Sequence, residues 1–456
     1  MLRTVIRQEL LDHVMSFRFS AITALTLLLM VVSVMVFSSS HALRVREYPG
    51  RVEAFVDDEG KVNLFIIASQ AGGTVRERPS PLGFCSAAGE RELPNEAVMA
   101  VHALNAIQRA AEPGEILNTA SLLDWTFIVA VILSFGAGLL TYKSVSGERR
   151  DGTLALVLSN PVPRATILGG KYIAALGALI VVLLCASLCS LIVLRTSGAV
   201  QPGADDWLKL AMFFLLSTLY LSVFVMTGLL CSVFTRSPVL SAVAFVFVWM
   251  GLVFVVPNLG GVLAGQLGSV MTPAQVRETA RTIPDQYTLS ASMNADEAAA
   301  VKLRRESARE KLLLEYAQTL VRQVQLGADI TLVSPSSVFS SGAEKIVGGG
   351  TSRLTHFVHN AVRYRERLFQ AILDADRNDP KSEHRYVPWW TGGNHFSQLT
   401  VDVGPAKEFR DTFPSSGEGL LAAAWNIVLL VLYNLIAFAV AFRRFVRQDV
   451  TPAPGV

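Results

Sequence analysis

The sequence predicts a mainly α-helical integral membrane protein with six membrane-spanning helices and a mixed α/β extracytoplasmic domain built from two inserts. Hydrophobic residues make up 51% of the 456 residues and charged residues only 17%. This charged fraction is well below the roughly 25% of ordinary globular domains. Long uncharged stretches can each cross about 30 Å of hydrocarbon at about 1.5 Å per residue. Two long polar segments separate these stretches.

Residues 1–18 are predicted to form an amphipathic helix that lies in the headgroup region. Leu2, Ile6, Leu10 and Val14 recur one helical turn apart, and the charged residues lie off this stripe. The alternative is that these residues are the first turns of a longer transmembrane helix. Residues 19–40 follow as the first span, because their uncharged core is longer than the about 7 to 15 residues of a signal-peptide core.

The first polar insert is predicted at residues 41–122, as a small folded unit outside the bilayer. Residues 51–69 contain two alternating runs around an acidic turn, which favours a hairpin. Residues 97–110 are predicted to form a short helix.

Four further spans are predicted at residues 123–143, 171–194, 210–235 and 237–271, and the sixth at 419–442. The fifth is longer than one straight crossing needs, and Pro257 interrupts it. We expect a kinked or broken helix there, whose freed carbonyls are satisfied by neighbouring helices or by water. The second and third spans are joined by a polar segment at 144–170, and the third and fourth by a short loop at 195–209. A tail at 443–456 follows the sixth span.

The second polar insert, residues 272–418, is predicted to be largely helical. Its clearest element is a helix over 294–325 with apolar residues along one face, and a second helix is expected over 352–374. The Ser, Pro and Gly residues between them predict a turn-rich connector at 332–350.

The distribution of Lys and Arg predicts the orientation. If the N-terminus is cytoplasmic, most short basic flanks fall inside, whereas the loop at 195–209 offers only Arg195 and Lys209 and also carries Asp205 and Asp206. This pattern follows the positive-inside rule. We therefore expect a multi-pass protein of the cell (inner) membrane with both termini cytoplasmic and both inserts outside, folded together.

Motifs of common enzymes are absent from the sequence. It contains no G-x-x-x-x-G-K-[ST] phosphate loop, no H-E-x-x-H and no G-x-S-x-G, so this chain alone is not expected to hydrolyse ATP or peptides. His356 and His359 share a predicted helix face, but no third ligand is fixed, and we predict no metal site. The scattered charges, with a net charge of +3, give no reason to expect a nucleic-acid partner.

The predicted spans contain no ionisable residue in their cores, which disfavours an ion-coupled carrier. Polar side chains there could line a substrate path, although hydrogen bonds between helices explain them as well. The candidates are Thr218, Tyr220, Asn258, Asn426 and Asn434.

The polar segment between the second and third spans is the main candidate for function. Leu154, Val157 and Leu158 form an apolar stripe, and Glu148 and Asp151 lie toward its N-terminal end, where the helix dipole favours acids. Prolines end the pattern. Such a helix could lie on the membrane surface or dock a soluble partner.

The run GERRDGTLALVLSNPVPRATILGGKYIAA resembles the coupling-helix segment of ABC-2-type transporter permeases. The matching positions, in the expected order, are Glu148, Gly152-Thr153-Leu154, Leu158-Ser159, Pro161, Arg164 and Lys171. Further stretches are similar to a subgroup with a large extracytoplasmic insert, related to permeases of gliding-motility and multicopper-enzyme-maturation systems. These stretches are residues 79–82 and 332–336, Asn434, and Arg447 with Asp449 and Val450.

The resemblance implies a six-helix permease of ABC-2 type that acts as an exporter. It would sit in the lipid bilayer, pair with a second copy or a paralogue, and dock a separate ABC-type ATPase that binds ATP and Mg, with no cofactor on this chain. Glu148 would be a polar anchor near the ATPase, Gly152 would allow close backbone approach, and Leu154 and Leu158 would be apolar contacts. The full set of implied coupling residues is Glu148, Arg149, Asp151, Gly152, Thr153, Leu154, Leu158, Pro161 and Arg164.

Two other classes remain open at this stage. One is a membrane-anchored sensor or scaffold with an extracytoplasmic binding domain, and the other is a secondary carrier. An ATPase partner would favour the permease, and a kinase or regulator partner would favour the sensor.

Overall fold

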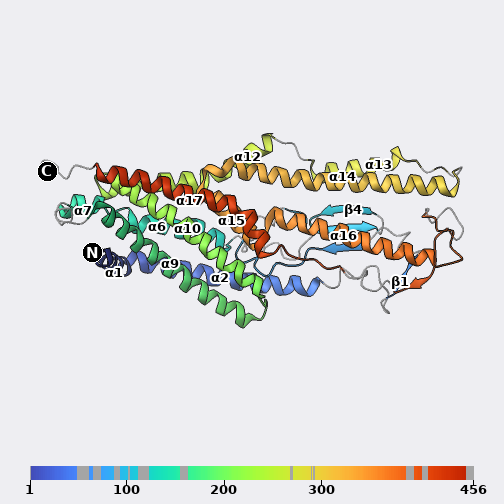
Figure 1. Cartoon of the computed structure of the whole chain (residues 1–456), viewed down its shortest axis with the longest axis horizontal. Helices are drawn as coiled ribbons and strands as arrows, with labels where there is room; N and C mark the ends of the chain where they lie inside the picture. The colour runs from blue at the N-terminus through green and yellow to red at the C-terminus, as the bar shows by residue number, and fades with distance from the viewer. Residues whose placement is uncertain are drawn as a thin grey trace.

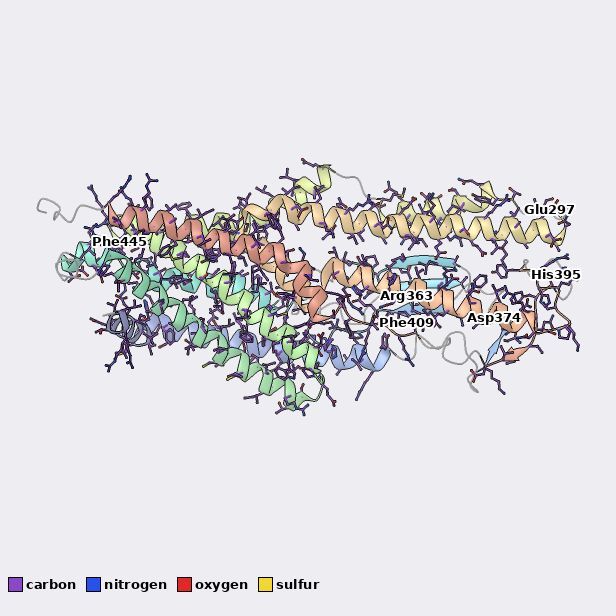
Figure 2. The ribbon with its side chains drawn as sticks, viewed as in Figure 1. Glu297, Arg363, Asp374, His395, Phe409 and Phe445 are labelled. Atoms are coloured by element: carbon purple, nitrogen blue, oxygen red, sulfur yellow. The ribbon has the colours of Figure 1, made fainter. Side chains whose placement is uncertain are left out.

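The computed structural model describes residues 2–48, 61–64, 73–86, 93–100, 103–110, 123–154, 163–267, 271–288, 290, 293–386, 395–402 and 409–447. These residues form an elongated molecule with a helical bundle at one end and a body of helices and strands at the other (Figure 1). The helix α1 (Leu2–Val14), the short helix α7 (Ser146–Arg150) and the C-terminal end of α17 (Ser416–Val446) lie together at the far end of the bundle. Figure 2 shows Phe445 at this end and Glu297 and His395 at the opposite tip.

Among the described residues, six helical stretches are long and apolar enough to cross a membrane. Each overlaps one of the predicted spans, so the mainly helical class with six candidate membrane helices is confirmed. The stretches are α2 (Phe17–Glu47), α5 (Trp125–Phe127) with η3 (Ile128–Leu133), α6 (Ser134–Thr141) and the adjoining α7, α9 (Arg164–Ser197), α10 (Ala204–Phe234), α11 (Pro238–Met250) with η4 (Gly251–Val255) and α12 (Val256–Leu267), and α17.

The N-terminal amphipathic segment is a helix of its own. It ends at Val14, and α2 begins at Phe17 after a turn in which Ser16 Oγ accepts a hydrogen bond of 3.2 Å from the Phe19 N–H. α1 packs against α9, and an added Cβ at Gly170 would lie 2.7 Å from Val5 Cγ1. The first candidate span therefore starts after α1, not within it.

The fifth candidate span contains a π-helical turn, η4, directly before Pro257. Proline has no N–H to donate, so in π-helical spacing the carbonyl of Leu252 loses its partner. The hydroxyls of Ser334 and Ser336 donate to this carbonyl instead, the second at 3.0 Å. α11, η4 and α12 follow one another without a gap, so the helix is not broken, and a neighbouring segment satisfies the freed carbonyl.

That neighbouring segment is a helix, and the prediction of a turn-rich connector at 332–350 is wrong. After the 3₁₀ turn η5 (Thr331–Val333), α15 runs over Pro335–Val347. Ser334 Oγ accepts from the N–H of Ser336, Pro335 occupies the first helical position, and Gly348 ends the helix at φ +80°. The residues that suggested turns are the start and stop signals of a short helix.

α15 belongs to the bundle although it lies within the second polar insert. It packs against α10 and α17, and Val338 and Phe339 are buried in the same core as the spans. Asn426 of α17 donates to the Val338 carbonyl at 2.9 Å and accepts from Lys345 Nζ at 3.0 Å. Phe339 stacks on Tyr220 of α10 with ring centroids 4.4 Å apart.

The distal body combines parts of both inserts. Strands β2 (Gly73–Arg76), β3 (Glu96–Ala100) and β4 (Ala103–Gln108) form an antiparallel sheet in that order, and β1 (Val62–Asn63) pairs with β5 (Thr400–Val401). Helix α14 (Ala295–Ile330) contacts β4, and α16 (Gly350–Arg377) contacts β3 (Figure 1). A further helix, α13 (Pro273–Gln286), packs on α14.

Two expectations for the first insert differ from the structure. The helix predicted at 97–110 is wrong, because this segment forms β3 and β4. β3 has a strand on each side and is largely buried, so pairing and packing override the helix propensity of its alanines. The sequence predicts a hairpin at 51–69, but β1, the strand described in this range, pairs with β5 of the second insert. Residues 51–60 and 65–69 lie outside the described residues.

A buried arginine joins the two inserts. Arg353 of α16 forms an ion pair with Asp411, and its Nε lies 2.7 Å from Glu77 Oε1 in the first insert. The guanidinium also donates to the carbonyl of Thr412 at 3.2 Å. Because a buried cation needs such partners to offset its lost hydration, these contacts fix the inserts to each other.

A buried lysine predicts that the stability of this body depends on pH. Lys302 is 5% exposed, and its Nζ lies 3.5 Å from the centre of the Tyr386 ring. Burial, assisted by Arg305, lowers the pKa of Lys302 to about 7. The unfolded pKa is about 10.4. Below about pH 7 the lysine is charged in both states and its burial cost is fully present, and this cost is relieved as the pH rises toward about 10.

The free energy of unfolding should therefore rise between about pH 7 and 10, by at most about 1.4 kcal/mol per pH unit from this group. Lys302→Met should remove that part of the slope, which denaturation followed by tryptophan fluorescence across this range can measure. The same pH slope in both proteins would show that Lys302 does not titrate there.

Candidate functional site

The base of α7 is fixed on the end of α10. Ser232 Oγ accepts hydrogen bonds from the N–H groups of Val145 and Ser146, at 2.9 and 3.0 Å. Arg149 Nη1 donates to the Thr235 carbonyl at 3.0 Å. Two of these bonds hold backbone groups at the start of α7 and the third holds a side chain of its last turn, so α10 sets the position of the helix.

Lys171 joins α7 to two further helices. Its Nζ lies 2.6 Å from Glu148 Oε1 on α7 and 2.5 Å from Glu9 Oε1 on α1, while Lys171 itself belongs to the second turn of α9. The lysine side chain is only 4% exposed. An ion pair removed from water is costly to separate, because each charge would be left without a partner. Lys171 therefore ties α7 to both α1 and α9.

Beyond Glu148 the chain forms an exposed tip, which we define as residues 150–153. Arg150 Nε and Asp151 Oδ1 form an exposed ion pair of 3.0 Å. Gly152 has φ +73°, and a Cβ added there would meet no atom of the described residues within 4 Å. Thr153 Oγ1 donates to the Glu148 carbonyl at 3.3 Å. The tip is thus accessible to a partner, whereas the Glu148 carboxylate is directed at Lys171.

The other implied coupling residues have different places. Leu154 is buried against the bundle core. Arg164 Nη1 donates to the carbonyls of Phe445 and Val446 at 3.1 and 2.6 Å, which caps the end of α17. Leu158 and Pro161 lie outside the described residues.

Sequence reasoning did not find Glu9. This residue is 162 positions from Lys171, and no spacing rule connects them. The only signal was an acidic residue on the polar side of an amphipathic helix, which is ordinary for a surface helix.

Four of the five candidates for a substrate path form hydrogen bonds within the bundle. Tyr220 Oη donates to a carbonyl of η3 at 2.8 Å, Asn434 Nδ2 donates to a carbonyl of α10 at 3.1 Å, and Asn426 bonds α15. Asn258 donates to its own helix at 2.7 Å, and Thr218 is half-buried on α10. Their part in a substrate path stays a prediction.

A separate apolar cavity of about 340 Å³ lies between α2 and the second candidate span. Its lining includes Ile22, Phe135, Gly136 and Trp249, with Arg18 among the lining residues, and it includes none of the five candidates above.

Two histidines of the distal body lie beside acidic side chains. His384 Nδ1 lies 3.1 Å from Asp376 Oδ2, and His395 Nδ1 lies 2.5 Å from Glu383 Oε2. Across the described part of the chain, no group of three or more His, Cys, Asp or Glu residues is arranged to hold a metal ion.

Comparison with known proteins gives one family. The family model described as ABC-2 family transporter protein matches residues 3–450, which include all six candidate spans, both inserts and α7. No curated protein matches the chain. The length of the family match, together with the six apolar helices, identifies a multi-pass membrane protein and a transport component, not an enzyme. The chain belongs to the ABC-2 transporter family and is a permease component of an ABC transporter.

Proposed function

We propose that this chain is the membrane subunit of an ATP-driven exporter, and that α7 with the tip at 150–153 receives motion from a separate ATPase subunit. The observation that carries the proposal is the buried contact of Lys171 with Glu148 and Glu9. It connects an exposed tip to the interfacial helix and to a membrane span, as a coupling element requires. Residues Arg149, Asp151, Gly152 and Thr153 would position or contact the ATPase, which would bind ATP and Mg.

The arrangement of basic residues supports a cytoplasmic position for α7. The helices α1 and α7 and the end of α17 share one end of the bundle, and the two inserts share the other (Figure 1). The α7 end carries most of the short basic flanks, so the positive-inside rule favours the cytoplasm on this side of an inner membrane. A second copy or a paralogue would complete the transporter, within the subgroup that has a large extracytoplasmic insert.

Recovery of the partner ATPase with Gly152→Trp tests the proposed contact. A Cβ added at Gly152 would meet no described atom within 4 Å, so an indole there should block a partner at the tip without overlapping the bundle. The φ of +73° strains a non-glycine residue by about 1–2 kcal/mol, and this strain falls on an exposed tip. We expect at least a tenfold loss of co-purified ATPase in mild detergent, equivalent to about 1.4 kcal/mol or more of binding free energy. Gly198→Trp is the matched control, because Gly198 is also open and has φ +66° but lies beyond α9 at the other end of the bundle.

Two results would count against the proposal. Equal ATPase recovery with both variants would remove the tip from the interface. Recovery of a kinase or regulator, with no ATPase, would support the sensor or scaffold instead.

A further inference from the structure

Three arginines converge on the turn that joins α10 to α11. Arg236 lies in this turn and is exposed. Arg149 of α7 donates to the carbonyl of Thr235, the residue before Arg236, at 3.0 Å. The guanidinium of Arg444, near the end of α17, lies over the Phe234 ring, 5.5 Å from its centre. The helices α7 and α17 and the turn itself thus each place one arginine beside residues 234–236.

No carboxylate of the described residues forms an ion pair with these arginines. Nearby arginines are engaged otherwise, since Arg150 pairs with Asp151 and Arg164 caps α17. Like charges close together repel one another, and an anion between them would reverse the sign of the interaction. Guanidinium groups match phosphate oxygens in geometry and charge. The cluster therefore has the composition of a phosphate site.

Apolar side chains are exposed directly beside the cluster. Phe234 is 49% exposed, and Val239 and Leu240, in the first turn of α11, are 72% and 56% exposed. The cluster stands where two candidate spans end, so cations at headgroup level adjoin side chains at the depth of acyl chains. A carboxylate on a soluble protein would not need this apolar surface, whereas a phospholipid needs both parts.

We propose that Arg149, Arg236 and Arg444 bind the phosphate headgroup of an anionic phospholipid, whose acyl chains lie on Phe234, Val239 and Leu240. An anionic headgroup fits better than phosphocholine, because the choline would add a fourth cation to the cluster. Because Arg149 is part of α7, the bound lipid would stabilise the contact of α7 with α10 and α17. This site does not depend on the proposed coupling function.

Native mass spectrometry of the full-length protein tests the site, with dioleoyl phosphatidylglycerol or dioleoyl phosphatidylcholine added to the detergent. The wild-type protein should retain phosphatidylglycerol more tightly. Arg236→Ala with Arg444→Ala should weaken its binding about 100-fold, from about tenfold for each charge-assisted hydrogen bond to the phosphate that is lost. Arg443→Ala with Arg447→Ala is the control, because it removes the same number of exposed positive charges from the same end of the bundle. This control should change the affinity less than about threefold.

Several results would overturn the site. Equal retention of the two lipids by the wild-type protein, or equal losses in the cluster and control variants, would leave only nonspecific attraction. Weaker ATPase binding in the cluster variant at unchanged lipid affinity would make the cluster a protein contact. Asp449 follows α17 in the sequence and lies outside the described residues, so the Asp449→Asn variant is tested in the same lipid-binding measurement. A tenfold or larger rise in lipid affinity in this variant, about 1.4 kcal/mol, would show that Asp449 occupies the cluster.

Discussion

Replacing Lys171 with methionine is expected to abolish the stimulation of the partner ATPase by this chain. The lysine is 4% exposed and holds Glu9 at 2.5 Å and Glu148 at 2.6 Å. Without it, two carboxylates lie close together in a site that excludes most water. Removing one partner of a buried ion pair typically costs about 3–5 kcal/mol. α7 would then lose its connection to α1 and α9, and the rate of ATP hydrolysis in the reconstituted complex should fall at least tenfold, by about 1.4 kcal/mol or more.

Two further proteins separate coupling from stability. Lys209→Met removes another buried lysine at the opposite end of the bundle, where Lys209 Nζ donates to the Pro414 carbonyl at 2.7 Å. It should lower the thermal midpoint but leave the stimulation intact. Lys171→Met combined with Glu9→Gln and Glu148→Gln removes all three charges, which should restore much of the stability without restoring the stimulation. Stimulation by Lys171→Met alone at wild-type level would show that the ionic contact does not carry the motion.

Gly419→Ala is expected to destabilise the contact between α17 and α15 strongly for so small a change. An added Cβ would lie 2.7 Å from the Lys345 carbonyl oxygen and 3.0 Å from that of Ile346. Both atoms are backbone, so no side-chain rotation can relieve the overlap and one helix must shift. Overpacking of this kind typically costs about 1–3 kcal/mol.

Gly417→Ala, two residues earlier in the same helix, is the matched control, because its Cβ would meet no atom within 4 Å. Its effect should stay within about 0.5 kcal/mol. Denaturation of both variants in detergent or bicelles, followed by fluorescence, measures the difference. Equal midpoints would mean that α15 is not held as closely to α17 as the structure has it.

The membrane helices could be predicted from the sequence because their signal is local. A run of uncharged residues longer than the bilayer core is sufficient, and each predicted span overlaps an observed helix. The helix predicted at 294–325 was also locally encoded. Asn294 accepts from the Glu297 N–H at 2.8 Å, and Glu297 accepts from the Asn294 N–H at 3.3 Å, which is the capping box that begins α14.

Elements that depend on their neighbours could not be predicted in the same way. The same residue types favour a turn and the ends of a short helix, as Ser334, Pro335 and Gly348 do here. Only the packing of α15 against α10 and α17 decides between these two structures. The segment that forms β3 and β4 contains alanines that suit a helix, but it forms strands because β3 has a partner on each side.

The candidate site was predicted only in part, because one half of it has a local sequence signal and the other half depends on packing. The exposed tip follows from a polar, glycine-containing segment between two apolar ones. The ion-pair partners of Lys171 follow only from the packing of α1, α7 and α9. This contact also gives Glu148 a different surrounding from the one that the family resemblance implied, since its carboxylate faces Lys171 within the chain.

The most direct test of the coupling role is the rate of ATP hydrolysis by the partner ATPase in liposomes, measured alone, with the wild-type chain and with Lys171→Met. The account predicts a clear rise with the wild-type chain, and a rate close to that of the ATPase alone with the variant, while the ATPase stays bound to both. The same rate in all three samples, with the ATPase bound, would contradict a role for this chain in coupling ATP hydrolysis to transport.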